Sequence, residues 1–243
     1  MKVIGVIPAR YGSSRFPGKP LALIHGKPMI QRVYEQVAQS KKLDQVVVAT
    51  DHEKIKEAVE TFGGQVVMTS TEHDTGSDRI AEVTNKVDGD FYVNIQGDEP
   101  LIRYELIDSL VEAAKQAPNA VVTAKTQITS LEEVENPNVV KVVTDAHGYA
   151  LYFSRSPIPY NRANHKVSYY KHLGIYGYPK AVINAFVQLP TSELEEIEVL
   201  EQHRLLNHGY DIKVVETTYH AIGVDTPEDI EKVENLLGGV QHV

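Results

Sequence analysis

The stretch VIGVIPARYGSSRFPGKPL, residues 3–21, decides the fold. It opens on the apolar run Val3–Ile7, which is typical of a buried strand, and then passes directly into a loop rich in glycine and cations. Further β-branched runs follow at Val46–Thr50, Val66–Met68 and Phe91–Gln96. Continuous apolar runs of this length predict strands that are covered on both faces, as in a parallel sheet.

Helical patterns separate these strands. Two segments carry apolar residues at the three- and four-residue spacing that places them on one helix face. The stripes are Ile30, Val33, Tyr34 and Val37 in the first segment, and Ile55, Val59 and Phe62 in the second. Strands that alternate with helices predict βαβ units. We therefore expect an α/β fold in which a mostly parallel, nucleotide-binding sheet is flanked by helices.

The second half of the chain has a different pattern. Residues 139–178 contain the short strand-like pieces VVKVVTD, YALYFS and HLGIYGY, and seven of the thirteen tyrosines lie between Tyr149 and Tyr178. Such density is typical of a substrate wall or a subunit interface, and equally of aromatic side chains packed in a core. The pattern predicts an added β-rich region and leaves these roles open.

Three helix starts carry the residues of a capping box, in which a Ser or Thr and an acid three positions later satisfy each other's backbone amides. The pairs are Ser130 with Glu133, Ser192 with Glu195, and Thr226 with Asp229. Proline at the first helical position strengthens the last pair. It predicts a closing helix at about Pro227–Leu237.

Composition excludes several classes of protein. Lys and Arg number 24 against 33 Asp and Glu, a net charge of −9, which argues against nonspecific binding to nucleic acid or anionic lipid. The chain has no cysteine, so disulfides, thiolate nucleophiles and cysteine-based metal sites are excluded. No apolar run approaches the roughly 20 residues that span a bilayer. We expect a cytoplasmic protein without membrane insertion.

The loop after the first strand has the composition of an anion site. Arg10, Arg15 and Lys19 are interspersed with Gly12 and Gly18, at the strand end where α/β proteins bind ligands. Glycines let backbone amides approach phosphate oxygens, and the cations offset polyphosphate charge. The spacing is neither that of a Walker A loop nor a GxGxxG. The alternative interpretation is an ordinary basic surface loop.

Two acidic segments point to the same edge of the sheet. The strand Phe91–Gln96 leads into Gly97 and Asp98 in NIQGDEP, and Asp225 precedes the closing helix in GVDTPED. Mg²⁺ binds proteins through one or two carboxylates plus substrate phosphates. We therefore predict that Asp98 and Asp225 are magnesium ligands. A turn aspartate and a helix-dipole partner are the respective alternatives.

Together these segments resemble the 3-deoxy-manno-octulosonate cytidylyltransferase family. The resemblance runs from the glycine-rich loop through ATDHE, NIQGDEP, YALYFSRSPIPY, KHLGIYGY and LEQHRLL to GVDTPED, nearly the whole chain. It implies a fold like that of the nucleotide-diphospho-sugar transferases. It also implies activation of the acid sugar Kdo by CTP and Mg²⁺, giving CMP-Kdo and pyrophosphate for lipopolysaccharide biosynthesis, and a homodimer built through the β-rich region.

The resemblance implies a role for individual residues. The triphosphate would be held by Arg10, Ser13, Arg15 and Lys19, and the nucleotide flanked by Ser77 and Arg79. Asp98 and Asp225 would carry magnesium and, with Arg10 and Lys19, form the catalytic set. The acid sugar would be surrounded by Gln96, Arg155, His172, Tyr176, Glu201 and Gln202. His203 departs from the family, whose members commonly have an apolar residue there.

The same resemblance divides the chain, which we expect to be a single nucleotidyltransferase domain over residues 1–243. Residues 1–128 would be mainly the nucleotide-binding half, and residues 139–178 the sugar-binding and dimer region. Residues 191–237 would supply the closing helices and a metal aspartate.

Glu201 has a structural and a functional interpretation. On one helix after Ser192 it interrupts an apolar stripe of Leu194, Ile197 and Leu205, so the carboxylate needs a partner. That partner is either Arg204 at i+3 or a hydroxyl of the sugar. The neighbouring acids Glu193, Glu195, Glu196 and Glu198 are interpreted as a solvated face.

Three other functions compete with Kdo activation. The chain could act on another acid sugar, such as 8-amino-Kdo or a sialic-acid-like sugar. It could be a nucleotide-sugar sensor without catalysis, although both predicted metal aspartates are retained. A metal-dependent glycosyltransferase needs a DxD motif, and the one present, Asp88–Asp90, precedes its strand and so lies at the wrong end of the sheet. The ten histidines form no HxH or HExxH pair, which argues against a zinc enzyme.

Overall fold

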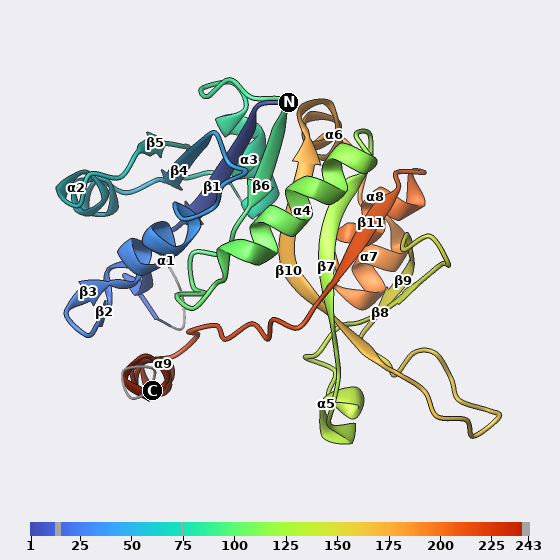
Figure 1. Cartoon of the computed structure of the whole chain (residues 1–243). Helices are drawn as coiled ribbons and strands as arrows, with labels where there is room; N and C mark the ends of the chain where they lie inside the picture. Colours follow the sequence, from blue (N-terminus) through green and yellow to red (C-terminus); the bar gives the residue numbers. More distant parts are fainter. Residues whose placement is uncertain (13–15, 74, 240–243) are drawn as a thin grey trace. The chain divides into compact units, whose positions relative to one another are not determined.

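The computed structural model describes residues 1–12, 16–73 and 75–239, and the chain divides into two units (Figure 1). The first unit joins residues 1–108 to the C-terminal segment that begins at Ala221, and the second is Ser109–His220. The predicted candidates Ser13 and Arg15 lie outside the described residues.

The first unit contains the predicted parallel strands. They are β1 (Val3–Ala9), β4 (Gln45–Thr50), β5 (Val66–Met68) and β6 (Phe91–Asn94). Their order is β6-β1-β4-β5, with every neighbouring pair parallel. β1 and β4 are almost wholly buried, as their continuous apolar runs predict.

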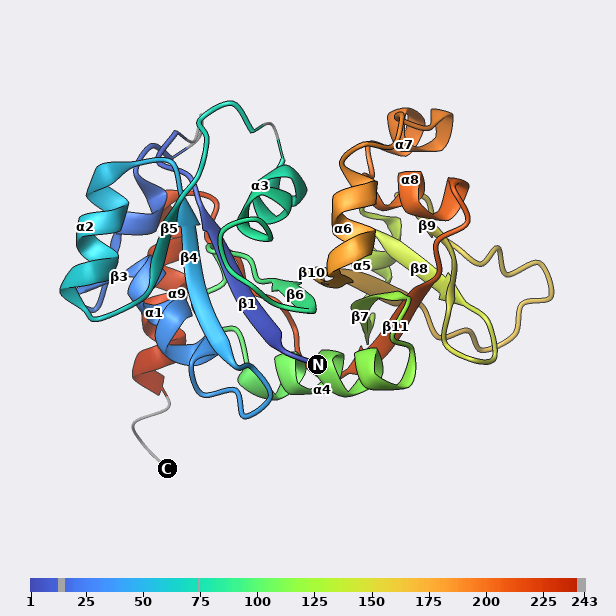
Figure 2. The same ribbon diagram turned by 90° about the horizontal axis from the view of Figure 1, so that it is seen from above.

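Helices cover both faces of these strands. They are α1 (Met29–Val37), α2 (Glu53–Thr61) and α3 (Gly76–Val83). The crossovers through α1 and α2 advance from β1 to β4 to β5, whereas the one through α3 returns to β6. Because such crossovers are right-handed, the return places α3 on the opposite face (Figure 2). The expected α/β class is confirmed.

The C-terminal helix completes the first unit. Helix α9 (Pro227–Gly239) lies near the small hairpin of β2 (Leu23–Ile24) and β3 (Lys27–Pro28). Between them is a core cluster whose fully buried members are Ile24, Met29, Val224 and Val233. The helix starts at the predicted proline, and Asp229 accepts from the Thr226 amide at 3.1 Å.

The second unit holds the predicted β-rich region. Its strands are β7 (Val121–Gln127), β8 (Lys141–Thr144), β9 (Ala150–Ser154), β10 (Tyr170–Pro179) and β11 (Ile212–Thr217). β11 pairs with β7 in parallel, whereas β10 with β7, β10 with β8, and β8 with β9 are antiparallel. Helix α4 (Tyr104–Gln116) contains the division between the units, and α5 (Leu131–Glu135) and α6 (Lys180–Phe186) belong to the second.

The prediction of a single continuous helix after Ser192 is wrong. The chain forms α7 (Glu193–Glu198) and α8 (Gln202–Asn207), separated by Val199 in the left-handed conformation at φ 53° and ψ 51°. The predicted stripe is therefore interrupted, and Ile197 is 67% exposed. The expected capping box of Ser192 and Glu195 does form.

The other caps have mixed outcomes. Ser130 caps α5 by accepting from the Glu132 amide, while Glu133 pairs instead with Lys171 at 2.6 Å. A capping box that the sequence analysis missed, Thr75 with Asp78, begins α3. Across the described residues, no helix combines the length and apolar character required to cross a bilayer.

Candidate functional site

Lys19 joins the two predicted metal aspartates. It begins the short 3₁₀ helix η1 (Lys19–Leu21), and its Nζ lies 2.7 Å from Asp98 Oδ2 and 3.6 Å from Asp225 Oδ1. The same Nζ donates to the Val224 carbonyl at 2.9 Å, and the Val224 amide donates to the Asp98 carbonyl at 2.9 Å. Three segments far apart in the sequence therefore place one cation and two carboxylates together in the first unit.

Two glycines let the loops take this arrangement. Gly18 has φ 70°, a left-handed conformation that a side chain would strain, and its amide donates to the Tyr11 carbonyl at 2.9 Å. A Cβ on Gly97 would lie 2.6 Å from the Pro8 carbonyl oxygen, at the end of β1. The loop after β6 is thus packed directly on the β1 backbone, which brings Asp98 toward Lys19.

The donor set fits a hard divalent cation. Within the described ranges no cluster of three or more His, Asp or Glu side chains has metal-binding geometry, so the protein itself offers two carboxylates at this place. Mg²⁺ is commonly bound in just this way, with water and substrate phosphates completing its shell. Asp98 and Asp225 are 32% and 54% exposed, so both are open to a ligand.

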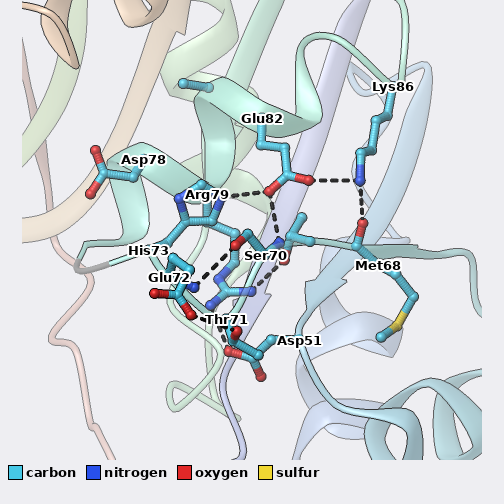
Figure 3. Close-up of polar contacts among 12 residues, drawn as sticks. Asp51, Met68, Ser70, Thr71, Glu72, His73, Asp78, Arg79, Glu82 and Lys86 are labelled. Carbon is cyan, nitrogen blue, oxygen red and sulfur yellow. Dashed lines mark hydrogen bonds and ion pairs between the residues drawn. The ribbon is translucent and has the colours of Figure 1, made fainter.

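The other predicted nucleotide residues have different settings. Arg10 is exposed after β1, and Ser77 is buried in the first turn of α3. Arg79 is fully buried; it pairs with Asp51 at 2.8 Å and donates to the Thr69 hydroxyl (Figure 3). Arg79 therefore ties α3 to the residues that follow β4 and β5. Its ion pair with Asp51 was not predicted from the sequence.

A second polar cluster joins α3 to the segment that follows β5. Glu82 accepts from the Ser70 amide at 2.8 Å, the Lys86 ammonium at 2.7 Å and His73 Nε2 at 2.5 Å (Figure 3). Partial burial raises the pKa of Glu82, but the hydrogen bonds from Lys86, Ser70 and His73 outweigh it and lower the pKa to about 2. The cluster pins residues 70–73 to the helix.

This cluster predicts acid-sensitive stability. Because its pKa is lowered on folding, Glu82 adds stability that is present above its unfolded pKa of about 4.3 and is lost as the pH falls toward 2. We expect Glu82→Gln to lower the free energy of unfolding by about 1–2 kcal/mol at pH 7. Urea unfolding at pH 7 and pH 3 checks this, and an equal difference between the two proteins at both pH values contradicts it.

Several predicted sugar residues gather in the second unit. The rings of His172 and Tyr176 lie 5.2 Å apart on β10, and His172 Nε2 is 3.0 Å from the Thr123 hydroxyl. Burial lowers the pKa of His172 to about 3, so the imidazole is neutral at pH 7. Burial, together with Tyr178 and Glu201, raises the pKa of Tyr176, which places the Glu201 carboxylate within electrostatic reach of that phenol.

Three buried polar side-chain atoms of the second unit lack a hydrogen-bond partner among the described residues. They are the Tyr176 hydroxyl, Gln202 Nε2 and His203 Nδ1. Such groups are costly, and each needs an explanation. A polyhydroxylated ligand would supply partners of the kind that the Tyr176 and Gln202 atoms lack. The other ring nitrogen of His203 does have a partner, because Nε2 lies 2.8 Å from the Phe153 carbonyl oxygen.

Arg155 is committed to the protein backbone. Its guanidinium donates to the carbonyls of Glu198 at 2.7 Å, Pro137 at 3.0 Å and Val199 at 3.3 Å. Its amide donates to the Glu198 carboxylate at 2.9 Å. Binding of a sugar carboxylate by Arg155 therefore stays a prediction, and it requires these bonds to be exchanged.

The solvated face expected for the acids around α7 is confirmed for Glu193 and Glu196, which are exposed, and is wrong for Glu195 and Glu198. Glu195 is buried and pairs with Arg204 through two contacts, of 2.8 and 2.5 Å, so Arg204 is engaged by Glu195 rather than serving Glu201 alone. Glu198 is half-buried and accepts from the Ser154 hydroxyl at 2.7 Å.

Gln96 is half-buried after β6 in the first unit, and its contact with the sugar stays a prediction.

The DxD-like segment lies at the opposite end of the strands from Asp98. Asp90 accepts from the Lys2 amide at 2.7 Å, immediately before β1 begins. This is the amino end of β1, whereas Asp98 follows the carboxyl end of the neighbouring β6. The structure confirms that Asp88–Asp90 does not belong to the site of Lys19.

Comparisons with known proteins agree with this arrangement. A cytidylyltransferase family model matches residues 4–213. A relative from Fusobacterium nucleatum is 51% identical over 98% of this chain and 97% of its own length, and one from Thermodesulfovibrio yellowstonii is 49% identical over 98% of each. Both are named 3-deoxy-manno-octulosonate cytidylyltransferase.

Solved structures extend the likeness. The structure of CMP:2-keto-3-deoxy-manno-octonic acid synthetase complexed with CTP has a TM-score of 0.95 and 47% identity, and the match covers 98% of this chain and 99% of that one. A 4-diphosphocytidyl-2C-methyl-D-erythritol synthase from Anaerococcus prevotii shares the fold, with a TM-score of 0.65 at 19% identity, over 98% and 99% of the two chains. The chain therefore belongs to the cytidylyltransferases and, among them, to the 3-deoxy-manno-octulosonate cytidylyltransferase family of nucleotidyltransferases.

Proposed function

We propose that the protein transfers the cytidylyl group of CTP to 3-deoxy-D-manno-octulosonate, giving CMP-Kdo and pyrophosphate for lipopolysaccharide biosynthesis. The observation that carries the proposal is the meeting of Lys19, Asp98 and Asp225 beside the carboxyl end of β1. The two relatives and the CTP-bound structure supply the substrates by name.

The transfer exchanges a phosphoanhydride bond of CTP for a phosphate ester bond to the sugar. The anomeric oxygen of the sugar acid bonds to the α-phosphorus of CTP, its proton is released to solvent, and the bond to the bridging oxygen breaks so that pyrophosphate leaves. Binding both substrates in line provides most of the acceleration through positioning. Arg10 and Lys19 would neutralise the charge that develops on the departing pyrophosphate.

Asp98 and Asp225 would hold Mg²⁺ for this reaction. Bound there, the cation would polarise the α-phosphate and reduce its repulsion of the incoming oxygen. The two carboxylates are already fixed, because Lys19 bridges them and the Val224 amide ties the two loops together. The chain thus supplies a preorganised pair of carboxylates, and the Lys19 ammonium between them would move toward the phosphates when a metal cation binds.

The second unit would bind the acid sugar. The Tyr176 hydroxyl and the Gln202 amide nitrogen are buried donors without partners among the described residues, and a sugar with several hydroxyls supplies acceptors. His172 would contribute a neutral imidazole. A site built to hydrogen-bond hydroxyls rejects analogues that lack them, because the buried groups are then left unpaired.

Pyrophosphate release tests the proposal. CTP is incubated with Kdo, 8-amino-Kdo or a sialic acid, each with and without Mg²⁺, and with a control that lacks sugar. We expect release with Kdo that depends on Mg²⁺. Release with only another acid would keep the reaction and change the sugar, and no release with any acid from protein that binds CTP would favour the nucleotide-sugar sensor.

We also propose a homodimer that works in the cytoplasm, where CTP is made. Several large apolar side chains of the second unit are exposed, including Leu151 at 62%, Ile197 at 67% and Tyr160 at 87%. Exposed apolar groups of this kind are commonly covered by a partner. Sedimentation at micromolar concentration checks the dimer, and a monomer under those conditions contradicts it.

A further inference from the structure

The turn between α7 and α8 holds an unfavourable backbone conformation. Val199 has φ 53°, a region that side chains branched at Cβ rarely adopt. Its side chain is 73% exposed, so burial of the valine does not offset the strain. Another part of the structure must therefore keep Val199 in this conformation.

Arg155 supplies the restraint. Its Nε donates to the Glu198 carbonyl at 2.7 Å and a terminal nitrogen donates to the Val199 carbonyl at 3.3 Å, so one planar group spans the carbonyls on both sides of the turn. In return, the Glu198 carboxylate accepts from the Arg155 amide at 2.9 Å and from the Ser154 hydroxyl at 2.7 Å. We call these contacts the Arg155–Glu198 clamp.

The base of the clamp is itself fixed. Lys141 is fully buried on β8, and its Nζ donates to the carbonyls of Arg155 and of Asn136, the latter at 3.0 Å. A buried ammonium group is costly unless its donors are satisfied, so these bonds hold the Arg155 backbone firmly. The clamp thus runs from β8 through the end of β9 to the end of α7.

The residues that follow the turn, Glu201 and Gln202, are two of those that the proposed function assigns to the sugar. Val199 ends α7, Glu201 precedes α8, and Gln202 begins it. Gln202 is buried with its Nε2 unpaired among the described residues. A different conformation at Val199 would move both side chains together, because only Leu200 separates them from the turn.

We propose that Arg155 is a positioning residue, whose guanidinium holds Val199 in its left-handed conformation and thereby sets Glu201 and Gln202 for the acid sugar. The inference rests on the proposed function, and it differs from the role that the resemblance implies, in which Arg155 binds the sugar directly. Arg155 acts through the turn, and its three backbone bonds are kept when the sugar binds.

The test combines removal of the clamp with relief of the strain. We expect Arg155→Gln to raise KM for Kdo by about 10- to 100-fold, the size of effect that small misplacements of binding groups produce, while KM for CTP stays within about twofold. Glycine adopts the left-handed conformation without strain. The double variant Arg155→Gln with Val199→Gly should therefore recover most of the lost affinity, whereas a direct ligand would not be replaced.

Hydrogen exchange gives a readout that does not depend on catalysis. Without substrate, the amides of residues 200–203 should exchange faster in Arg155→Gln than in the parent protein, and slow again in the double variant. Arg162→Gln, which removes an exposed arginine of the same unit, is the matched control and should leave both readouts unchanged. Glu198→Gln weakens the clamp from its other side and should change both readouts in the same direction, even where Arg155→Gln fails to fold.

Two results would overturn the proposal. One is a rate of amide hydrogen exchange at residues 200–203 that is the same in the parent, Arg155→Gln and Glu198→Gln proteins. The other is a raised KM for Kdo that Val199→Gly does not reduce, since this assigns Arg155 to the sugar itself. If the parent protein releases no pyrophosphate with any sugar acid, the proposed function fails, and hydrogen exchange still decides whether the clamp exists.

Discussion

Replacing Asp225 by asparagine is expected to lower kcat by about 10²- to 10³-fold, the loss that follows removal of one preorganised electrostatic group. An amide carries no charge, so it is a far weaker ligand than a carboxylate for a hard cation. The fold should survive, because the Asp225 side chain is 54% exposed and its backbone amide keeps a 3.1 Å bond to Asp229.

Steady-state pyrophosphate release over a range of Mg²⁺ concentrations measures this effect. Glu231→Gln is the control, since it removes an exposed carboxylate of α9 outside the site. It should leave kcat within about twofold. If the folded Asp225→Asn protein turns over at the parent rate at every Mg²⁺ concentration, Asp225 has no role in holding the cation.

Replacing Arg79 by methionine is expected to lower the free energy of unfolding by about 3–5 kcal/mol, because it leaves the Asp51 carboxylate without its buried partner. Asp51 is 14% exposed, and Arg79 is completely buried. Replacing both residues by apolar side chains, Arg79→Met with Asp51→Leu, should recover a substantial part of this loss, since no unpaired charge is then buried.

Urea unfolding of both variants checks the prediction, with Arg103→Met as the control because the Arg103 side chain is 60% exposed. CTP affinity is measured in parallel. An Arg79→Met protein that is as stable as the parent but binds CTP poorly would show that the residue serves the nucleotide, as the resemblance implies, and not the packing of α3.

The sequence was sufficient for the elements whose apolar pattern is unambiguous. The strand predicted at Val66–Met68 has those bounds, and the helix predicted from the stripe ending at Val37 ends there as α1. The meeting of Lys19 with Asp98 was also predictable, because the two residues follow β1 and β6, neighbouring parallel strands whose carboxyl ends lie at one edge of the sheet. Local chemistry and a general rule of topology were enough in these cases.

Other features depend on contacts between distant residues, which no local pattern reveals. Helical periodicity continues through Val199, yet the chain is left-handed there, and the Glu198 and Val199 carbonyls accept from Arg155, far away in the sequence. In the same way, a lone Arg79 in TGSDR looks like a surface cation until Asp51 and Thr69 are found beside it. Glu195 was misjudged because its partner is Arg204, on the next helix.

The first unit is built from two segments that are separated in the sequence by the whole second unit, and this has a consequence for synthesis on the ribosome. The core around Ile24 and Met29 is covered by Val224 and Val233, which are translated only after the whole of the second unit. A nascent chain that has passed residue 108 therefore carries an exposed apolar patch and lacks Asp225 until the second unit has been translated. Such a patch is a natural binding place for chaperones during that interval.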